Sequence, residues 1–147
     1  MDKVRVIDNW PTPEAGAPNP QVLADDNRLV LRYYTTDERI AVIEFPLVYI
    51  FTFGSPGDES LNGHPLYKHG LEFYRVHEIE DSSWITELEK QNSVHPRHDR
   101  AWFLKDKRHY VFTFHDSTLE CVAIEKDNSL PSVHICETKE EADRLFH

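Results

Sequence analysis

Cysteine is scarce in this sequence, with only two in 147 residues. The pair, Cys121 and Cys136, is too small for a disulfide scaffold, and it lacks the close spacing of a metal-binding motif. Both residues lie in segments of strand-like composition. Since unpaired cysteines behave as small apolar side chains, the sequence predicts two reduced and buried thiols.

Long apolar runs are also missing. The longest, from Phe45 to Phe53, is far too short to span a bilayer as a helix. The first sixteen residues, MDKVRVIDNWPTPEAG, contain no apolar stretch of signal-peptide length. We therefore expect a cytoplasmic protein that makes no membrane contact.

Positive charge is in deficit: 16 Lys and Arg stand against 26 Asp and Glu, which gives a net charge of −10. Binding to nucleic acid depends on neutralising phosphates with basic side chains, so this balance argues against a nucleic-acid partner. An acidic protein can still bind a basic one. The expected partner is a protein or a small-molecule ligand.

Apolar and aromatic residues are plentiful, at 39% and 12% of the chain, which is enough to form a core. The length fits one domain over residues 1–147. Residues 11–20, PTPEAGAPNP, hold four of the nine prolines. Because proline lacks a backbone donor and disfavours helix before itself, residues 1–20 are predicted to form an extended N-terminal arm.

Strand-like segments of alternating or β-branched composition recur along the chain: 3–7, 21–24, 28–34, 39–53, 71–78 and both halves of 109–123. The run 39–53 is apolar on both faces, with Pro46 as a break or bulge. Such a pattern predicts a central strand that is covered on both sides.

Two helices are predicted. Over 82–91, Asp81 or Ser82 can cap the first turn, and an apolar stripe follows at helical spacing: Trp84, Ile85 and Leu88. Residues 138–141 have capping-box spacing before a short C-terminal helix. The predicted fold is α+β, an antiparallel twisted sheet of about six or seven strands with the 82–91 helix packed on it.

The segment 109–123, HYVFTFHDSTLECVA, is predicted to be a hairpin turning near Asp116 and Ser117. Pairing Phe114 with Leu119 places every core residue on one face. The other face carries His115, Thr113 and Glu120. This face is either the solvated side of the sheet or a site, because imidazole and carboxylate can exchange protons or bind metal near neutral pH.

The loop 54–70 holds four glycines and two prolines, and a connection of this length is usually functional or disordered. If it meets the hairpin, the candidate catalytic residues are His64, His115, Asp116 and Glu120, with Asp116 orienting His115. No metal site is expected, since the ligand motifs are absent. Should a divalent metal bind, its ligands would be His64, His115 and Glu120.

The segment 95–109 carries five Lys and Arg against two Asp, the only cationic stretch of the chain. It is either a solvated loop or an anion-binding patch with Trp102 and Phe103 available for stacking. From the loop 54–70, this segment and the polar face of the hairpin we select candidate ligand-binding residues: His69, His95, Arg97, His98, Arg100, Trp102 and Thr113.

Motifs for nucleotide cradles and for a hydrolase nucleophile elbow are missing, and no cofactor is expected.

Three sequence blocks occur together in this order: FGSPGDESLNGHPLY (53–67), SSWITELEKQNSVHPRH (82–98) and HYVFTFHDSTLEC (109–121). With these blocks the chain resembles a family of small uncharacterised bacterial proteins. The resemblance implies a soluble bacterial single-domain protein, and it transfers no activity and no catalytic residue.

Two functions are consistent with the sequence. The first is a non-enzymatic binding or interaction protein, by analogy an inhibitor or immunity-type protein. The second is a small metal-dependent or His/Glu acid–base hydrolase, with a site between loop 54–70 and the 109–123 hairpin. A homodimer is compatible with either, through aromatic residues such as Tyr67 or Trp102.

Overall fold

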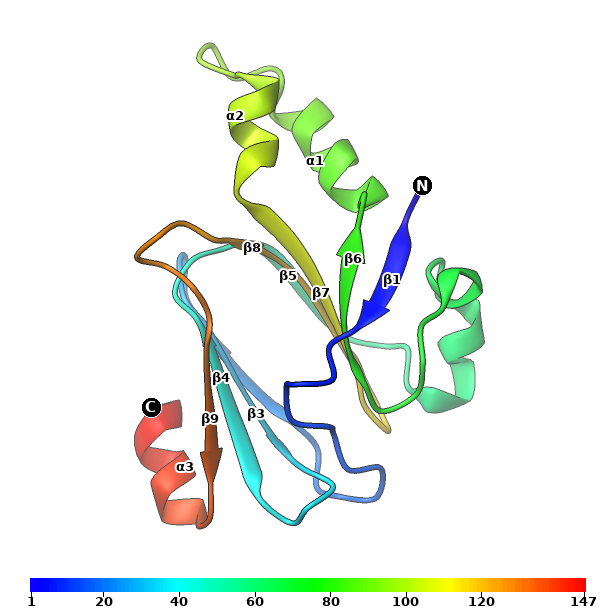
Figure 1. Cartoon of the computed structure of the whole chain (residues 1–147), viewed down its shortest axis with the longest axis vertical. Helices are drawn as coiled ribbons and strands as arrows, with labels where there is room; N and C mark the ends of the chain where they lie inside the picture. Colours follow the sequence, from blue (N-terminus) through cyan, green and yellow to red (C-terminus); the bar gives the residue numbers. More distant parts are fainter.

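The computed structural model describes residues 1–147 and contains two antiparallel sheets (Figure 1). Five strands form one sheet, in the order β1 (Lys3–Val6), β6 (Val76–Glu80), β7 (Lys107–Thr113), β8 (Thr118–Ile124) and β5 (Val48–Gly54). Four form the other: β2 (Gln21–Ala24), β3 (Leu29–Tyr34), β4 (Ile40–Phe45) and β9 (Ser132–Cys136). The α+β class is confirmed, with two sheets where the sequence predicted one.

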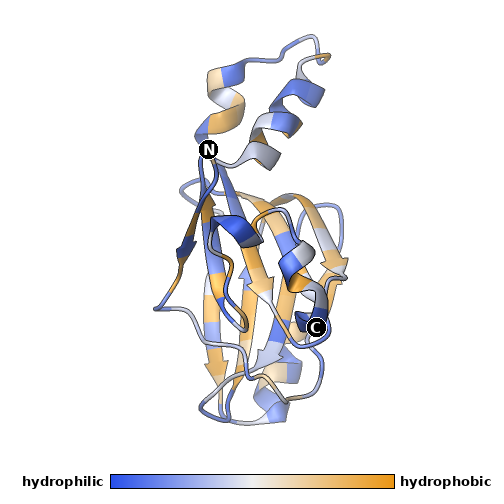
Figure 2. Cartoon of the chain, turned by 90° about the vertical axis from the view of Figure 1, so that its right-hand side faces the viewer, coloured by the Kyte–Doolittle hydropathy of each residue, from blue (hydrophilic) through white to orange (hydrophobic).

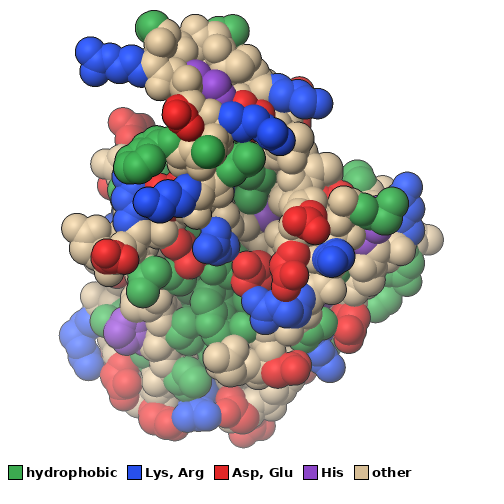
Figure 3. All heavy atoms as spheres, turned by 45° about the horizontal axis from the view of Figure 1, so that its top comes forward, with side chains coloured by type: hydrophobic (Ala, Val, Ile, Leu, Met, Phe, Trp, Pro, Cys, Tyr) green, Lys and Arg blue, Asp and Glu red, His purple; other side chains and the backbone are tan.

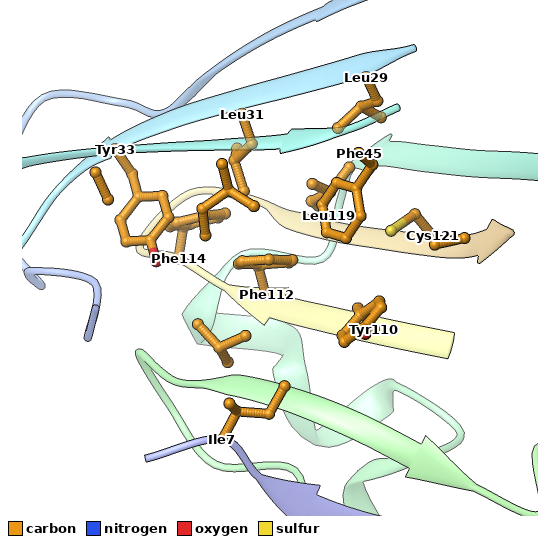
Figure 4. Packing of buried hydrophobic residues seen from close by; sticks show 14 residues of the cluster. Ile7, Leu29, Leu31, Tyr33, Phe45, Tyr110, Phe112, Phe114, Leu119 and Cys121 are labelled. Atoms are coloured by element: carbon orange, nitrogen blue, oxygen red, sulfur yellow. The ribbon is translucent and has the colours of Figure 1, made fainter. Parts of the chain in front are cut away.

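The main hydrophobic core lies between the two sheets, as the close-up in Figure 4 shows. Tyr33 and Phe45 from the four-stranded sheet meet Phe112 and Phe114 from β7 and its turn. Phe112 is fully buried, and its ring lies edge-on to that of Phe45 at 6.3 Å. Apolar residues recur along the strands in Figure 2. Burial of these aromatic rings is the main stabilising contribution in this layer.

The β7–β8 hairpin has the predicted faces but a different register. Phe112 pairs with Leu119, and Thr113 pairs with Thr118. The predicted pairing of Phe114 with Leu119 was therefore wrong by two residues. Because side chains alternate with a period of two, a shift of two leaves every residue on its predicted face. Phe114 lies in the turn and still packs in the core.

The run 39–53 forms two strands, one in each sheet. Strand β4 lies in the interior of the four-stranded sheet and is almost wholly buried, as predicted. Pro46 interrupts the run, and β5 then forms the edge of the five-stranded sheet, with residues 49–53 exposed. The prediction of a covered central strand was wrong for β5, since composition does not specify a strand's neighbours.

Three α-helices accompany the sheets: α1 (Ser83–Asn92), α2 (Arg100–Lys105) and α3 (Lys139–Phe146). The Ser82 hydroxyl accepts from the Ile85 amide at 3.1 Å, which confirms one of its two predicted caps. Helix α2 was not predicted. Together α1 and α2 form a hairpin that projects beyond the end of the five-stranded sheet in Figure 1.

The predicted loop 54–70 is ordered. It forms two short 3₁₀ helices, η1 (Asp58–Gly63) and η2 (Tyr67–His69). Leu61 and Leu66 pack against Val111 on the face of the five-stranded sheet that points away from the other sheet. The strand predicted over 71–78 begins only at Val76. The polar face of the hairpin therefore meets this loop.

The N-terminal arm contributes β1, an edge strand paired with β6. After β1 the chain packs against the main core, where the ring of Trp10 stacks on that of Tyr110 with the centroids 5.2 Å apart. Tyr33 donates a hydrogen bond to the carbonyl of Pro11 at 2.7 Å.

Cys121 and Cys136 are both free and buried, as predicted. None of the helices combines the length and apolar character needed to cross a membrane.

Candidate functional site

Three polar side chains meet on the outer face of the five-stranded sheet. Nε2 of His64, which follows η1, donates to one oxygen of Glu120 at 2.9 Å. Nε2 of His109 on β7 donates to the other oxygen at 2.7 Å. Glu120 lies on β8, so three elements supply the cluster. Its residues are buried to different degrees: the side chains of His64 and His109 are 8% and 1% exposed, and that of Glu120 is 17%.

The second nitrogen of each imidazole is also occupied. Nδ1 of His64 accepts from the Leu66 amide at 3.0 Å. Nδ1 of His109 lies 2.7 Å from the hydroxyl of Ser82, whose oxygen is already the acceptor for the α1 cap. The Ser82 proton is thus free to be donated to His109. This network places the ring protons on Nε2 of both histidines, pointing at Glu120.

The carboxylate of Glu120 is held in its ionised form. Burial by itself raises the pKa of Glu120, but hydrogen bonds from His109 and His64 outweigh that effect. They lower the pKa from 4.5 to about 2. A carboxylate that accepts two hydrogen bonds is stabilised as an anion, so Glu120 carries a fixed negative charge at neutral pH.

A pocket of about 460 Å³ opens beside this cluster. Its walls come from α1, the loop before η2, the strands β5, β7 and β8, and the N-terminus: Asp2, Thr52, His64, Pro65, Leu66, Ser83, Trp84, Glu87, His109 and Glu120. Three of these residues are acidic, and none is Lys or Arg. Asp2 accepts from the amide of Ser83 at 2.6 Å, which fixes it at the start of α1. The pocket is therefore acidic, with one aromatic wall.

A second polar cluster lies at the tip of the β7–β8 hairpin. Nδ1 of His115 is 2.7 Å from Oδ2 of Asp58, which also accepts from the hydroxyl of Tyr74. The hydrogen bonds from Tyr74 and His115 lower the pKa of Asp58. In turn, the contact with Asp58 raises the pKa of His115 above 6.5. His115 remains half-exposed and forms no part of the acidic pocket.

Of the four predicted catalytic residues, the structure brings together only His64 and Glu120. The proposed role of Asp116 as the orienting partner of His115 is wrong. Its carboxylate lies 3.8 Å from Nε2 of His115, whereas Asp58 makes the close contact with Nδ1. The conditional metal set of His64, His115 and Glu120 is likewise divided between the two clusters. No group of three His, Cys, Asp or Glu side chains is arranged as a metal site.

The predicted ligand-binding residues fall into separate places. His95, Arg97, His98 and Trp102 line a cavity of about 270 Å³ beside α2. His98 also lies 2.6 Å from Glu89 of α1, and it thereby helps to join α1 to the segment before α2. The anion-binding patch in this segment stays a prediction.

The remaining candidates do not line that cavity. Arg100 pairs with Glu89 at 3.3 Å. Thr113 is buried, and its hydroxyl donates to the carbonyl of Glu72 at 2.8 Å, which gives it a structural contact. His69 lies in η2 and lines neither cavity.

The sequence did not lead us to assign a site role to five residues of these clusters and of the pocket: Asp2, Ser82, Trp84, His109 and Asp58, the last of which was interpreted as part of a loop turn. His109 could have been found, because it has the same strand parity as Thr113 and so shares the polar face. Ser82 and Trp84 were interpreted only as a helix cap and a helix face. Nothing local in the sequence places Asp2 near α1, since that contact spans most of the chain.

Comparison of the chain with models of known protein families, with curated protein sequences and with solved structures finds no match.

Proposed function

We propose that this protein is a non-enzymatic binding protein whose acidic pocket accepts a cationic group of its partner. The fitting group is a lysine or arginine side chain on a basic segment of another protein. The main observation behind this proposal is the hydrogen-bonded carboxylate of Glu120. It lies in a pocket that also contains Asp2 and Glu87 but no Lys or Arg side chain. Such a pocket has three carboxylates and no Lys or Arg side chain to neutralise them.

Preorganisation supports this proposal. Both oxygens of Glu120 are held by imidazoles that are themselves held by Leu66 and Ser82. A fixed acceptor loses little conformational entropy when a ligand arrives. Trp84 adds an aromatic surface, and cations bind favourably over indole rings. Electrostatic complementarity between the acidic chain and a basic partner also accelerates association.

The acid–base alternative receives less support from the same geometry. A general base must offer a free lone pair to the substrate, and its pKa should lie near the working pH. In His64 and His109 both ring nitrogens are already hydrogen-bonded within the protein. Glu120, with a pKa of about 2, is a weak proton acceptor. The Ser82 hydroxyl is buried in the α1 cap and is not available as a nucleophile.

A titration with decalysine tests the proposal, with a decamer of acetyl-lysine as the uncharged comparison. Isothermal calorimetry at about 0.15 M salt limits long-range attraction between exposed charges. We expect decalysine to bind and the acetylated peptide not to bind. Glu87→Gln removes a pocket charge that has no hydrogen bond in the structure, and it should weaken binding by roughly three- to tenfold.

Glu140→Gln provides the matched control, since it removes one charge from an exposed position on α3, outside the pocket. We expect it to change affinity by less than about twofold, because screening attenuates the effect of a distant surface charge. Equal losses in the two variants would mean that decalysine senses only the net charge. That result, or equal binding of the acetylated peptide, or no binding at all, contradicts the proposed pocket.

A further inference from the structure

The acidic pocket has more negative charge than open hydrogen-bond acceptors. One oxygen of Asp2 accepts from the amide of Ser83 at 2.6 Å, and the other accepts from the Ser83 hydroxyl at 2.8 Å. Glu120 likewise accepts one imidazole N–H at each oxygen. Two of the three carboxylates in the pocket therefore have a donor on both oxygens. Only Glu87 keeps both of its oxygens free.

Organic cations of equal charge differ in the hydrogen bonds that they require. A lysine ammonium has three N–H donors and is strongly hydrated, so a pocket must replace the water contacts that it loses on entry. Each oxygen of Asp2 and Glu120 has one lone pair left, in a direction that the internal hydrogen bonds fix. A trimethylammonium group has no donor to place, because methyl groups occupy the positions of the hydrogens. This arrangement therefore favours a cation without N–H groups.

The walls of the pocket supply apolar and aromatic contacts for such a group. Pro65, Leu66 and the half-buried Trp84 line it, together with the rings of two histidines. The Trp84 ring lies edge to face with that of His109, with 5.1 Å between the centroids, and this contact holds the indole in place. Indole is the aromatic ring that attracts cations most strongly, and quaternary ammonium groups are recognised in this way. The volume of about 460 Å³ leaves room for the three methyl groups.

The absence of Lys and Arg distinguishes the pocket from the surrounding surface. On the face shown in Figure 3, basic side chains are mixed with acidic ones. In the pocket, three carboxylates act on a bound cation with no Lys or Arg in the lining to oppose them. Coulomb attraction depends on charge and distance and needs no hydrogen bond, so it acts on a quaternary ammonium as well as on lysine.

We propose that the acidic pocket prefers a quaternary ammonium group, as in Nε-trimethyllysine, over the primary ammonium of unmodified lysine. This inference rests on the proposed function, because it names the class of cation that the same pocket takes. Charge attracts both groups. The preference arises from the rings and apolar walls, which contact the methyl groups, and from carboxylates whose oxygens are already hydrogen-bonded. The partner is a protein that carries a trimethylated lysine within a basic segment.

Calorimetric titration of the full chain with two decamers, one of lysine and one of Nε-trimethyllysine, tests this preference. Both peptides are fully charged at neutral pH, so attraction that depends on charge alone is the same for both. At about 0.15 M salt we expect the trimethylated decamer to bind about fivefold more tightly. Trp84→Leu should remove most of this ratio, whereas Trp84→Phe, which keeps an aromatic ring, should retain part of it.

Phe73→Leu is the control, since Phe73 is an exposed aromatic residue that does not line the pocket. Its ratio should equal that of the wild type. Equal or weaker binding of the trimethylated decamer by the wild type overturns the inference, and this result decides the matter even if Trp84→Leu does not fold. A preference that persists in folded Trp84→Leu, or that falls equally in Phe73→Leu, overturns it as well.

Failure of the preference is distinguishable from failure of the proposed function. If decalysine binds and the trimethylated decamer binds no better, the preference is wrong and the cation-binding pocket stands. If neither decamer binds, the proposed function is wrong, and the preference falls with it.

Discussion

Replacing Glu120 with Gln tests the central hydrogen-bond network. The amide keeps the size of the side chain but removes its charge, and its NH₂ group faces a donor from one of the two imidazoles. One buried histidine N–H then loses its acceptor. A buried donor without a partner is destabilising, and the lost anion adds to the effect.

The magnitude follows from the pKa of Glu120, which is about 2 in the folded protein against an ordinary 4.5. At about 1.4 kcal/mol per pH unit, that difference corresponds to roughly 3 kcal/mol of folding free energy near neutral pH. Because the folded pKa is depressed, this contribution is complete above about pH 4.5. It is lost as the pH falls toward 2, where the carboxyl is protonated in both the folded and unfolded states.

Urea denaturation of the wild type and of Glu120→Gln, between pH 2 and 7, measures this contribution directly. We expect the variant to be about 3 kcal/mol less stable at pH 7, with the difference shrinking steadily below pH 4.5. Glu87→Gln is the control and should stay within about 0.5 kcal/mol of wild type, because Glu87 is exposed. A difference at Glu120 that does not depend on pH, or one below about 1 kcal/mol, would refute the reasoning.

Two further predictions concern the other cluster and the core. Asp58→Asn should lower the pKa of His115 toward 6.5, measured by NMR titration, since Asp58 is the main cause of its elevation. Asp116→Asn should lower it less, because that contact is longer; a larger effect at Asp116 would reverse the assignment. Phe112→Ala should cost about 3–5 kcal/mol of unfolding free energy, whereas Phe73→Ala should cost far less. Similar losses at the two sites would contradict the proposed core.

Local features of the fold could be predicted because their causes lie within a few residues. The helix over 82–91 follows from a serine cap and an apolar stripe. The faces of the β7–β8 hairpin follow from alternation, which survives an error of two residues in register. The exact strand pairing could not be predicted from local features. Asp116-Ser117 is a weak turn signal, and the turn extends from Phe114 to Ser117.

The candidate site could be predicted only in part. His64 and Glu120 were selected for their chemistry, but their neighbours come from distant positions. His109 replaces His115 in the cluster, and Asp58 replaces Asp116 beside His115. Each choice depends on how the loop 54–70 packs over the sheet, through Leu61 and Leu66 against Val111. A contact of that kind has no signature in a local pattern.

By itself, the sequence determined the α+β class, most of the strands, two helices and the buried cysteines, because local periodicity, capping and apolar content fix these features. Only the tertiary structure decided that the strands divide into two sheets and that β5 is an exposed edge. Strand neighbours depend on long-range packing, and an apolar run has the same composition at the centre of a sheet and at its edge. The same long-range packing brings His64, His109 and Glu120 together and forms the acidic pocket beside them.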